Sequence, residues 1–189
     1  MGCASAFKDL QLVEGPTRCV QQFIPHYQRN WFTASIDVQG HHLSGLLLLK
    51  RMPDGSDRIV FTNELGVTFF DFEFSAGDFK VIHVIDKLNV TAIINTLKQD
   101  FELLLLSGLE KEAVKKYSLA DESYYAFPWD DKINYIITDN NCTLIRLERG
   151  SAKKKLVVIG FESDNQNPEK IRIQHFNFNM QITLTKIER

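Results

Sequence analysis

The chain has 189 residues, of which 44% are hydrophobic and 24% are charged, with a formal net charge of −2 at pH 7. These values are typical of one globular domain and give no reason to expect a nucleic-acid partner. No run of about 18 apolar residues is present, so the sequence contains no candidate membrane-spanning helix. The 14 phenylalanines predict a large apolar interior or an apolar cavity, because phenylalanine carries no polar group.

The first residues predict a lipid anchor. Residues 1–7 read MGCASAF and lack the basic and apolar segments of a leader peptide. A cysteine beside the N-terminus, followed by small residues, is typical of a bacterial lipoprotein whose leader has been replaced, so Cys3 is the predicted acylation site. Myristoylation is the weaker match, because Ala6 stands where Ser or Thr is needed. We expect residues 1–15 to form a tether and residues 16–189 to form a single domain.

The cysteine count leaves the redox state open. Three cysteines leave at least one thiol unpaired even if Cys19 and Cys142 form a disulfide. Sequence spacing does not supply disulfide geometry, so this disulfide and three reduced thiols are both compatible with the sequence.

Residues 17–31 predict a helix that ends or kinks at Pro25. Its apolar positions at helical spacing are Val20, Phe23, Ile24, Tyr27 and Trp31. After residue 32 the pattern changes to period two, which predicts a half-buried strand over residues 33–38. A second strand is predicted over residues 42–52, where four consecutive leucines indicate burial on both faces.

Residues 57–74 predict a β-hairpin around which the chain is organised. Two segments rich in β-branched and aromatic residues flank Asn63, Glu64, Leu65 and Gly66, and Asn and Gly supply the positive φ angles of a tight turn. Leu65 has two interpretations: it folds back onto its own sheet, or it enters an apolar environment outside the protein. A further strand over residues 79–85 completes a five-stranded meander.

The longest helix is predicted over residues 90–105, with Asn89 able to cap its start and Gly108 its end. Apolar residues recur there at the helical period, so one face must pack on a sheet. A short, charged helical turn is predicted over residues 110–117, and strands over 133–138, 143–149, 155–161, 171–176 and 178–187. The last two are either separate strands or one long strand with a bulge near Asn177. The sequence thus predicts an α+β fold, in which a curved antiparallel sheet of about ten strands forms an unclosed half-barrel. A long central helix and an N-terminal helix cover it.

No motif of a catalytic or metal site is present. The sequence lacks HExxH, GxGxxG, a P-loop, GxSxG and CxxC. His41 and His42 are adjacent on a predicted strand and therefore point to opposite faces. Asp130 and Asp131 precede a strand, where a solvated turn explains them, and the basic run 153–155 reads as a turn with lipid-headgroup contact as the minor interpretation. We expect no enzymatic activity, no metal and no cofactor.

The turn Thr62-Asn63-Glu64-Leu65-Gly66 after a β-strand resembles a turn of the bacterial lipoprotein-trafficking proteins LolA and LolB. In LolB-like proteins a TNxLG turn carries a leucine that protrudes toward the membrane, and this sequence departs from that pattern at Glu64, where we expect proline. The order of helix, meander, central helix and second meander behind an acylated cysteine is also similar. The resemblance implies an unclosed barrel with an apolar cavity for lipoprotein acyl chains. It also implies a lipid-anchored protein of the bacterial envelope, at the outer membrane facing the periplasm.

On this resemblance, Leu65 is the predicted membrane-insertion residue. The predicted partners are lipid or lipoprotein acyl chains and a membrane surface, and a periplasmic carrier protein is a further candidate partner. The predicted lipid-binding residues are Leu47, Leu49, Phe61, Phe70, Phe72, Ile93, Leu97 and Phe101. The alternative is that these residues fill a dry core. The protein would then be a structural or interaction lipoprotein that uses the half-barrel as a scaffold. A closed lipocalin-like barrel is disfavoured by the helix in the middle of the chain.

Overall fold

One antiparallel sheet of 13 strands and one α-helix make up most of the structure of this protein, a computed structural model that describes residues 7–75, 78–111, 114–151, 154–163 and 167–188. The described elements, in chain order, are β1 (Gln11–Leu12), η1 (Arg18–Phe23), β2 (Arg29–Val38), β3 (His41–Arg51), β4 (Asp57–Thr62), β5 (Thr68–Ser75), β6 (Asp78–Val84), η2 (Asp86–Leu88), α1 (Thr91–Leu104), η3 (Leu109–Lys111), β7 (Lys115–Leu119), β8 (Glu122–Trp129), β9 (Lys132–Thr138), β10 (Leu144–Gly150), β11 (Lys155–Glu162), β12 (Lys170–His175) and β13 (Met180–Ile187).

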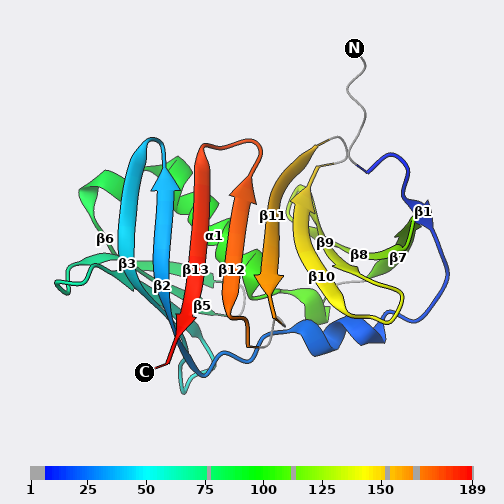
Figure 1. Ribbon diagram of the computed structural model, residues 1–189, viewed down its shortest axis with the longest axis horizontal. Helices are drawn as coiled ribbons and strands as arrows, with labels where there is room; N and C mark the ends of the chain where they lie inside the picture. Colours follow the sequence, from blue (N-terminus) through cyan, green and yellow to red (C-terminus); the bar gives the residue numbers. More distant parts are fainter. Residues whose placement is uncertain (1–6, 76–77, 112–113, 152–153, 164–166, 189) are drawn as a thin grey trace, which may run out of the picture.

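The sheet order is β1-β7-β8-β9-β10-β11-β12-β13-β2-β3-β4-β5-β6, and all neighbouring strands are antiparallel. Two meanders are therefore joined where the last strand, β13, pairs with β2 in the register Ile182↔Ile36. Among the described strands, β6 and β1 do not pair with each other, so the sheet is unclosed, as the sequence predicts. In Figure 1, β3, β2, β13, β12 and β11 stand side by side in front of α1.

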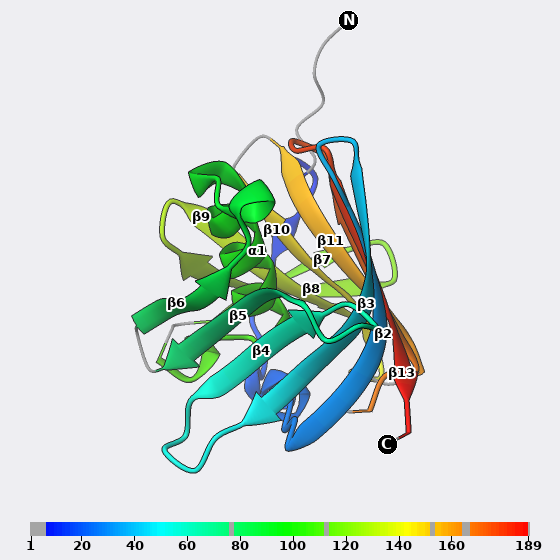
Figure 2. The same ribbon diagram turned by 90° about the vertical axis from the view of Figure 1, so that its left-hand side faces the viewer.

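The sheet curls around α1, with β2, β3 and β13 on one side of the helix and β6 on the other (Figure 2). The predicted central helix is confirmed over Thr91–Leu104, and Val90 rather than Asn89 occupies its N-cap position. Ile93, Leu97 and Phe101 point into the core because they recur at the helical period. Asp100 is the exception to this pattern, since it is charged but only 1% exposed. No helix of the described chain is long and apolar enough to cross a membrane.

The predicted N-terminal helix is a six-residue 3-10 helix, η1, and it is shorter than expected. Val20 and Phe23 are buried, which accounts for the apolar spacing at its start. Trp31, assigned to the same helix by spacing, instead lies in β2 opposite Leu48 and Ile187. Pro25 explains the difference, because a proline cannot continue the helix and the chain becomes extended after it.

The prediction of about ten strands omits β1, β7 and β8. The segment predicted as a charged helical turn contains only η3, and Lys115–Leu119 forms β7. These strands lack the clear alternation of a half-buried strand, because β8 has buried residues on both faces and ends in Pro128-Trp129. β1 falls within residues 1–15, the predicted tether, and Phe7 stacks on Tyr135 with ring centroids 4.4 Å apart.

Gly45 marks the place where the β4–β5 hairpin crosses over β3. A Cβ atom on this residue would lie 1.9 Å from the Thr62 carbonyl oxygen and 2.9 Å from the Asn63 Cα. The β4–β5 register also shifts between Phe61 and Thr62, immediately before the turn. Because glycine has no side chain, the backbone of the β4–β5 turn can lie close to β3 at position 45, and this close approach sets the direction of the turn.

Candidate functional site

The eight residues predicted to bind lipid are brought together by the structure. All belong to one buried cluster between the concave face of the sheet and α1, and none is more than 6% exposed. The aromatic members are in contact, with ring centroids 4.6 Å apart for Phe70 and Phe72 and 6.0 Å apart for Phe70 and Phe101. They form a packed core in this structure, and their role in lipid binding stays a prediction.

A cleft of about 520 Å³ opens at one end of this core. It lies between the C-terminal end of α1, η1 and three turns: β3–β4, β5–β6 and β8–β9. Its apolar lining is formed by Ile24, Phe74, Phe79, Leu105, Leu106 and Trp129. Phe74, Leu105 and Leu106 are also members of the buried cluster, so the cleft opens directly onto the core.

Charged side chains surround the apolar lining of the cleft. Arg51 Nε lies 2.9 Å from Asp57 Oδ1, and Lys98 Nζ lies 3.6 Å from Glu102 Oε1. The Trp129 indole N–H donates a hydrogen bond of 3.2 Å to Glu102 Oε2. The cleft is thus amphipathic and fits a ligand that has both an apolar body and a charged group.

The surroundings of two carboxylates in the cleft, Asp57 on β4 and Glu102 on α1, shift their pKa values. Burial raises the pKa of Asp57 to about 6, against the opposite effect of Arg51. Burial also raises the pKa of Glu102, while Lys98 and Arg149 act against it. A bound cation would favour the ionised form of both groups, because it would replace the solvation that burial removes.

Leu65 lies at the tip of the β4–β5 turn and is 91% exposed, so it does not fold back onto the sheet. The turn is held by three hydrogen bonds: Asn63 N–H to the Val67 carbonyl at 2.9 Å, Gly66 N–H to the Asn63 carbonyl at 3.1 Å, and Val67 N–H to Asn63 Oδ1 at 2.8 Å. Gly66 has φ of +86°, as the sequence predicts for this position. Val67 beside it is 53% exposed, so the tip presents two apolar side chains to solvent.

The β4–β5 turn and the cleft lie at opposite ends of β4, since Asp57 begins the strand and Thr62 ends it. Six residues of strand span roughly 20 Å. Cys3, the predicted acylation site, lies outside the described residues.

A disulfide joins Cys19 in η1 to Cys142 in the β9–β10 turn, 123 residues apart in sequence, with a Cα–Cα distance of 6.5 Å. It fastens η1 across one end of the sheet, next to Ile24 of the cleft. Sequence reasoning left this pairing open, because nothing local connects the two segments.

Polar contacts hold α1 to the sheet. His175 Nε2 lies 2.8 Å from Asp100 Oδ1, and His175 Nδ1 donates to the Met180 carbonyl at 2.9 Å. Arg149 Nη1 donates to the Gln99 carbonyl at 2.8 Å. Burial lowers the pKa of Arg149 to about 10 and raises that of Asp100. Burial lowers the pKa of His175, but the hydrogen bond and charge of Asp100, with the Met180 carbonyl, raise it above its ordinary value overall.

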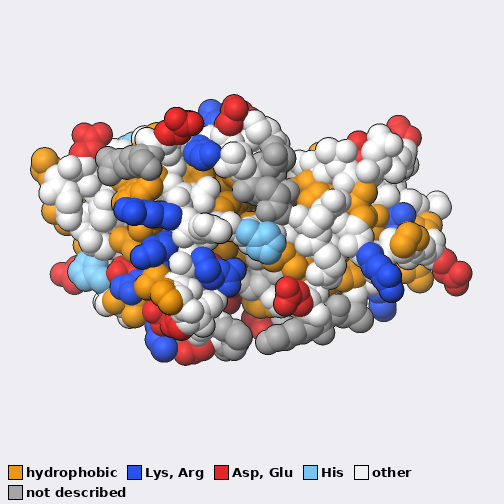
Figure 3. All heavy atoms as spheres, turned by 90° about the horizontal axis from the view of Figure 1, so that it is seen from below, with side chains coloured by type: hydrophobic (Ala, Val, Ile, Leu, Met, Phe, Trp, Pro, Cys, Tyr) orange, Lys and Arg blue, Asp and Glu red, His pale blue; other side chains and the backbone are white. Residues whose placement is uncertain are grey.

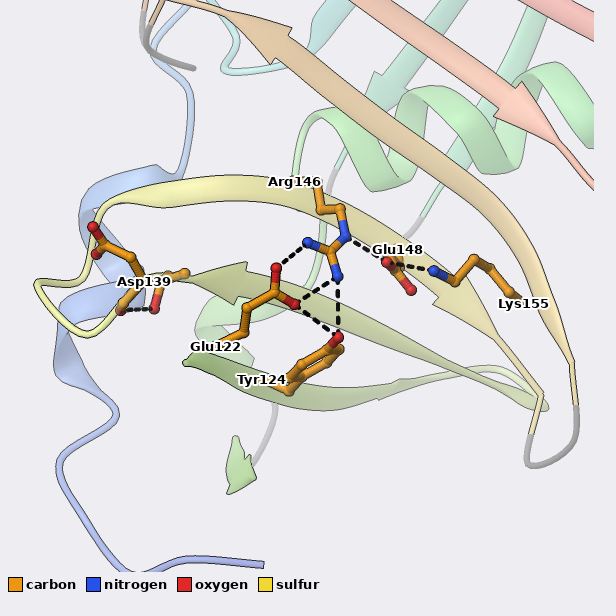
Figure 4. A network of polar contacts seen from close by, with 7 residues as sticks. Glu122, Tyr124, Asp139, Arg146, Glu148 and Lys155 are labelled. Atoms are coloured by element: carbon orange, nitrogen blue, oxygen red, sulfur yellow. Dashed lines mark hydrogen bonds and ion pairs between the residues drawn. The ribbon is translucent and has the colours of Figure 1, made fainter. Parts of the chain in front are cut away.

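A second polar network lies on the other face of β8 and β10 (Figure 4). Arg146 donates to both carboxylate oxygens of Glu122 at 2.6 and 2.8 Å, to Glu148 at 2.6 Å and to the Tyr124 hydroxyl at 3.0 Å. Lys155 Nζ donates to Glu148 Oε1 at 2.8 Å. The hydrogen bond from Arg146 lowers the pKa of Glu122, and burial raises the pKa of Tyr124 to about 12. Each cation is matched by a carboxylate, which suits a structural role.

Sequence reasoning missed the cleft residues Asp57, Lys98, Glu102 and Trp129. The one available signal was Asp130-Asp131, interpreted as a solvated turn; both residues lie in the β8–β9 turn, and Asp130 also lines the cleft.

Among the described residues, no group of three or more His, Cys, Asp or Glu side chains is placed to hold a metal ion. The face seen from below in Figure 3 mixes apolar, acidic and basic side chains.

No family model and no curated protein matches the sequence. Among solved structures, a DUF1329 family protein from Desulfovibrio piger is similar at a TM-score of 0.48 and 10% identity, over 90% of this chain and 89% of that one. A putative outer membrane lipoprotein-sorting protein domain from Vibrio parahaemolyticus is similar at a TM-score of 0.48 and 9% identity, over 90% and 89% of the two chains. Similarity at this level establishes neither a shared family nor a shared function.

Proposed function

We propose that this protein binds the acyl chains of a lipid or lipoprotein in its half-barrel and passes them to a membrane, as a binding protein rather than an enzyme. The observation that carries the proposal is the continuity between the cleft and the core. Phe74, Leu105 and Leu106 line the cleft and belong to the buried cluster, so an acyl chain in the cleft would contact core side chains at once. The chain would then insert between α1 and the concave face of the sheet, along the eight predicted residues.

The volume of the cleft supports a ligand of this kind. Small-molecule sites typically enclose about 300–1,000 Å³, and the cleft of about 520 Å³ falls within this range. A long acyl chain needs further space, which a displacement of α1 from the sheet would provide. The helix is held there by side-chain contacts with β10 and β12 rather than by the backbone ladder of the sheet.

The proposed compartment is the bacterial envelope, outside the cytoplasm. The support for this is the disulfide between Cys19 and Cys142, because disulfides persist in oxidising compartments and are rare in the cytosol. Within the envelope we propose the outer membrane, facing the periplasm, with Cys3 as the acylated anchor. A periplasmic carrier protein would be the donor of the cargo.

Delivery is proposed to use the exposed tip of the β4–β5 turn. One leucine contributes only about 1.5–3 kcal/mol on burial, too little to hold a protein at a bilayer. It suffices if an anchor at Cys3 already keeps the domain near the surface, because tethering raises the effective concentration. Phe7, which packs near Gly150 of β10, lies six interstrand steps from β4, roughly 30 Å along the sheet.

Native mass spectrometry of the full chain, purified from a bacterial envelope without detergent exchange, tests the binding step. The expected result is a population whose mass exceeds that of the protein by one lipid or lipoprotein. A single unliganded mass, unchanged after incubation with phospholipid vesicles, would contradict it.

The delivery step is tested with Leu65→Glu, which should keep the thermal stability and bound lipid of the parent but transfer less lipid to acceptor vesicles. Leu65→Phe is the matched variant and should transfer as the parent does. Equal transfer by the Glu variant would show that the turn has no part in delivery.

The second candidate function is a non-catalytic scaffold, and one observation favours it. The eight predicted lipid-binding residues are between 0% and 6% exposed, so they already fill the interior as ordinary core side chains do. The mass-spectrometry experiment separates the two functions, because a scaffold carries no lipid beyond an acyl anchor attached covalently at Cys3.

A further inference from the structure

The charged lining of the cleft is unequal in sign. Its cationic side chains are Arg51 and Lys98, and its acidic ones are Asp57, Asp78, Glu102, Glu110 and Asp130. The cleft also lies at the C-terminal end of α1, where the helix dipole presents partial negative charge. Both features favour a positively charged ligand over a negatively charged one.

The cleft already contains one alkylammonium group, that of Lys98, next to an aromatic ring and a carboxylate. Lys98 Nζ lies 5.7 Å from the centroid of the Phe79 ring and 3.6 Å from Glu102 Oε1. An ammonium between an aromatic ring and a carboxylate is the arrangement by which proteins bind organic cations. The Phe74 ring, with its centroid 5.1 Å from that of Phe79, extends the aromatic wall.

Two of the acidic side chains that line the cleft lie outside its ion pairs, and the charge of one of them, Asp130, also acts on the buried Arg149 guanidinium. Within the described part of the chain, Asp130 and Glu110 form no ion pair, whereas Asp57 and Glu102 are matched by Arg51 and Lys98. Asp130 has φ of +51°, a left-handed conformation at the β8–β9 turn that Asp and Asn tolerate better than most residues.

The Trp129 ring lines the same cleft as these carboxylates. It packs against Gly108, where a Cβ atom would lie 2.4 Å from the ring, and its indole N–H donates to Glu102. The cleft thus contains a third aromatic ring, half-buried, in addition to the two acids that form no ion pair.

We propose that this cleft binds an organic cation, an ammonium or quaternary ammonium group carried on an apolar body, with Asp130 and Glu110 facing the charge and Phe74, Phe79 and Trp129 contacting the body. This inference rests on the proposed function, since the apolar body is the acyl chain that continues toward the core, and it adds selection for a positive charge at the head of that chain.

The test uses two single-chain amphiphiles of equal length below their micellar concentrations, decyltrimethylammonium and decanoate. Binding is followed by Trp129 fluorescence in a Trp31→Phe variant, so that one indole reports. The expected result is that decyltrimethylammonium binds about tenfold more tightly than decanoate, with an affinity that falls as salt rises.

The double variant Asp130→Asn/Glu110→Gln should lose most of this preference while binding decanoate at least as well as the parent. Asn accepts the left-handed backbone of position 130, and thermal unfolding checks that the fold is kept. Glu64→Gln, which removes an exposed acid at the distant β4–β5 turn, is the matched control and should leave both affinities unchanged.

Two outcomes would overturn the inference. Equal affinity of the parent for both amphiphiles would remove the charge selection and leave the proposed acyl-chain binding intact. Binding of neither amphiphile would remove the cleft as a site altogether, and the lipid content found by mass spectrometry would then decide the proposed function separately.

Discussion

The two halves of the sheet are stabilised in different ways, although they belong to one continuous ladder of strands. In the β3–β6 half, the buried rings of Phe70 and Phe74 on β5 pack on Phe101 of α1, and Phe61 of β4 packs on Phe70. In the β8–β10 half, the face turned away from α1 carries the network of Arg146, Glu122 and Glu148 beside a small apolar cluster. The stability of the β3–β6 half therefore depends on the volume and shape of its apolar side chains. The stability of the β8–β10 half depends on each charged side chain having a partner of opposite charge.

This difference follows from how many faces of each strand are covered. The inner faces of β4 and β5 meet the helix, so large apolar side chains are stabilised there by burial. Strands β8 and β9 are covered on both faces, because Phe7 and Leu10 pack on the face turned away from α1, together with side chains of the neighbouring strand β7. Glu148, only 1% exposed in its side chain, is tolerated there because Arg146 and Lys155 both donate to it.

Breaking the disulfide that fastens η1 to the β9–β10 turn of the β8–β10 half should have the largest effect. The double variant Cys19→Ser/Cys142→Ser removes a disulfide that closes a loop of 123 residues, which a chain-entropy estimate values at about 5 kcal/mol. Urea unfolding followed by circular dichroism should show a fall in the free energy of unfolding of this order. An unchanged midpoint would mean that the two cysteines are not bonded in solution.

Removing volume from the apolar half should cost nearly as much. Phe101→Ala leaves a cavity among the rings of Phe70 and Phe74, and such truncations typically cost about 3–5 kcal/mol. Phe101→Leu is the matched variant and should cost clearly less. Because no ionisable group is involved, the loss should be the same at pH 5 and pH 8.

The approach of the β4–β5 hairpin to β3 gives a third test. Gly45→Ala places a methyl group against the Thr62 carbonyl oxygen, so the hairpin must move, at a cost of about 1–3 kcal/mol. Gly160→Ala in β11 is the control, because a Cβ atom there has no neighbour within 4 Å, and it should change stability by less than about 1 kcal/mol. Equal effects in thermal unfolding would contradict the close approach at Gly45.

Removing a charge from the network in the β8–β10 half should lower the stability of the protein by an amount that depends on pH. Arg146→Met leaves the buried Glu148 with Lys155 alone and should cost about 1–3 kcal/mol at neutral pH. The pKa of Glu122 is lowered by Arg146, so the stability that this pair contributes is present above the ordinary pKa of a glutamate and is lost as the pH falls through the folded value. The difference between parent and variant, measured by urea unfolding, should therefore narrow in acid.

The contact between Asp100 of α1 and His175 of β12 should contribute less to stability than the Arg146 network, and its contribution should depend on pH in the opposite direction. The pKa of His175 is raised in the folded state, so its contribution is complete below the unfolded value of about 6.5 and is lost as the pH rises through the folded value. The stability difference between the parent and His175→Gln should therefore shrink from pH 6 to pH 9. A difference that grows with pH would contradict this assignment.

The sequence by itself determined the elements whose pattern is local and strongly periodic. The helix over residues 90–105 matched α1 to within one residue at each end, and the turn formed where it was predicted, with positive φ at Gly66. The prediction of positive φ at Asn63 was wrong, because this residue holds the turn by accepting a hydrogen bond from Val67 N–H through its side chain. Both depend on a few neighbouring residues: a 3.6-residue apolar repeat in the helix, and in the turn a glycine with positive φ and an asparagine whose side chain accepts a local hydrogen bond. The antiparallel order followed as well, because short connections join strands to their neighbours.

Only the tertiary structure decided the rest. It joined β13 to β2, paired Cys19 with Cys142, brought Asp100 next to His175, and assembled the cleft from α1, η1 and three separate turns. Each of these contacts spans tens of residues or more, and its members are unremarkable in their own local sequence. Charged residues such as Asp57 and Glu102 read as ordinary surface positions until burial and distant partners act on them. A periodic pattern indicates which face of an element is apolar, but the partner that covers this face depends on how the whole chain packs.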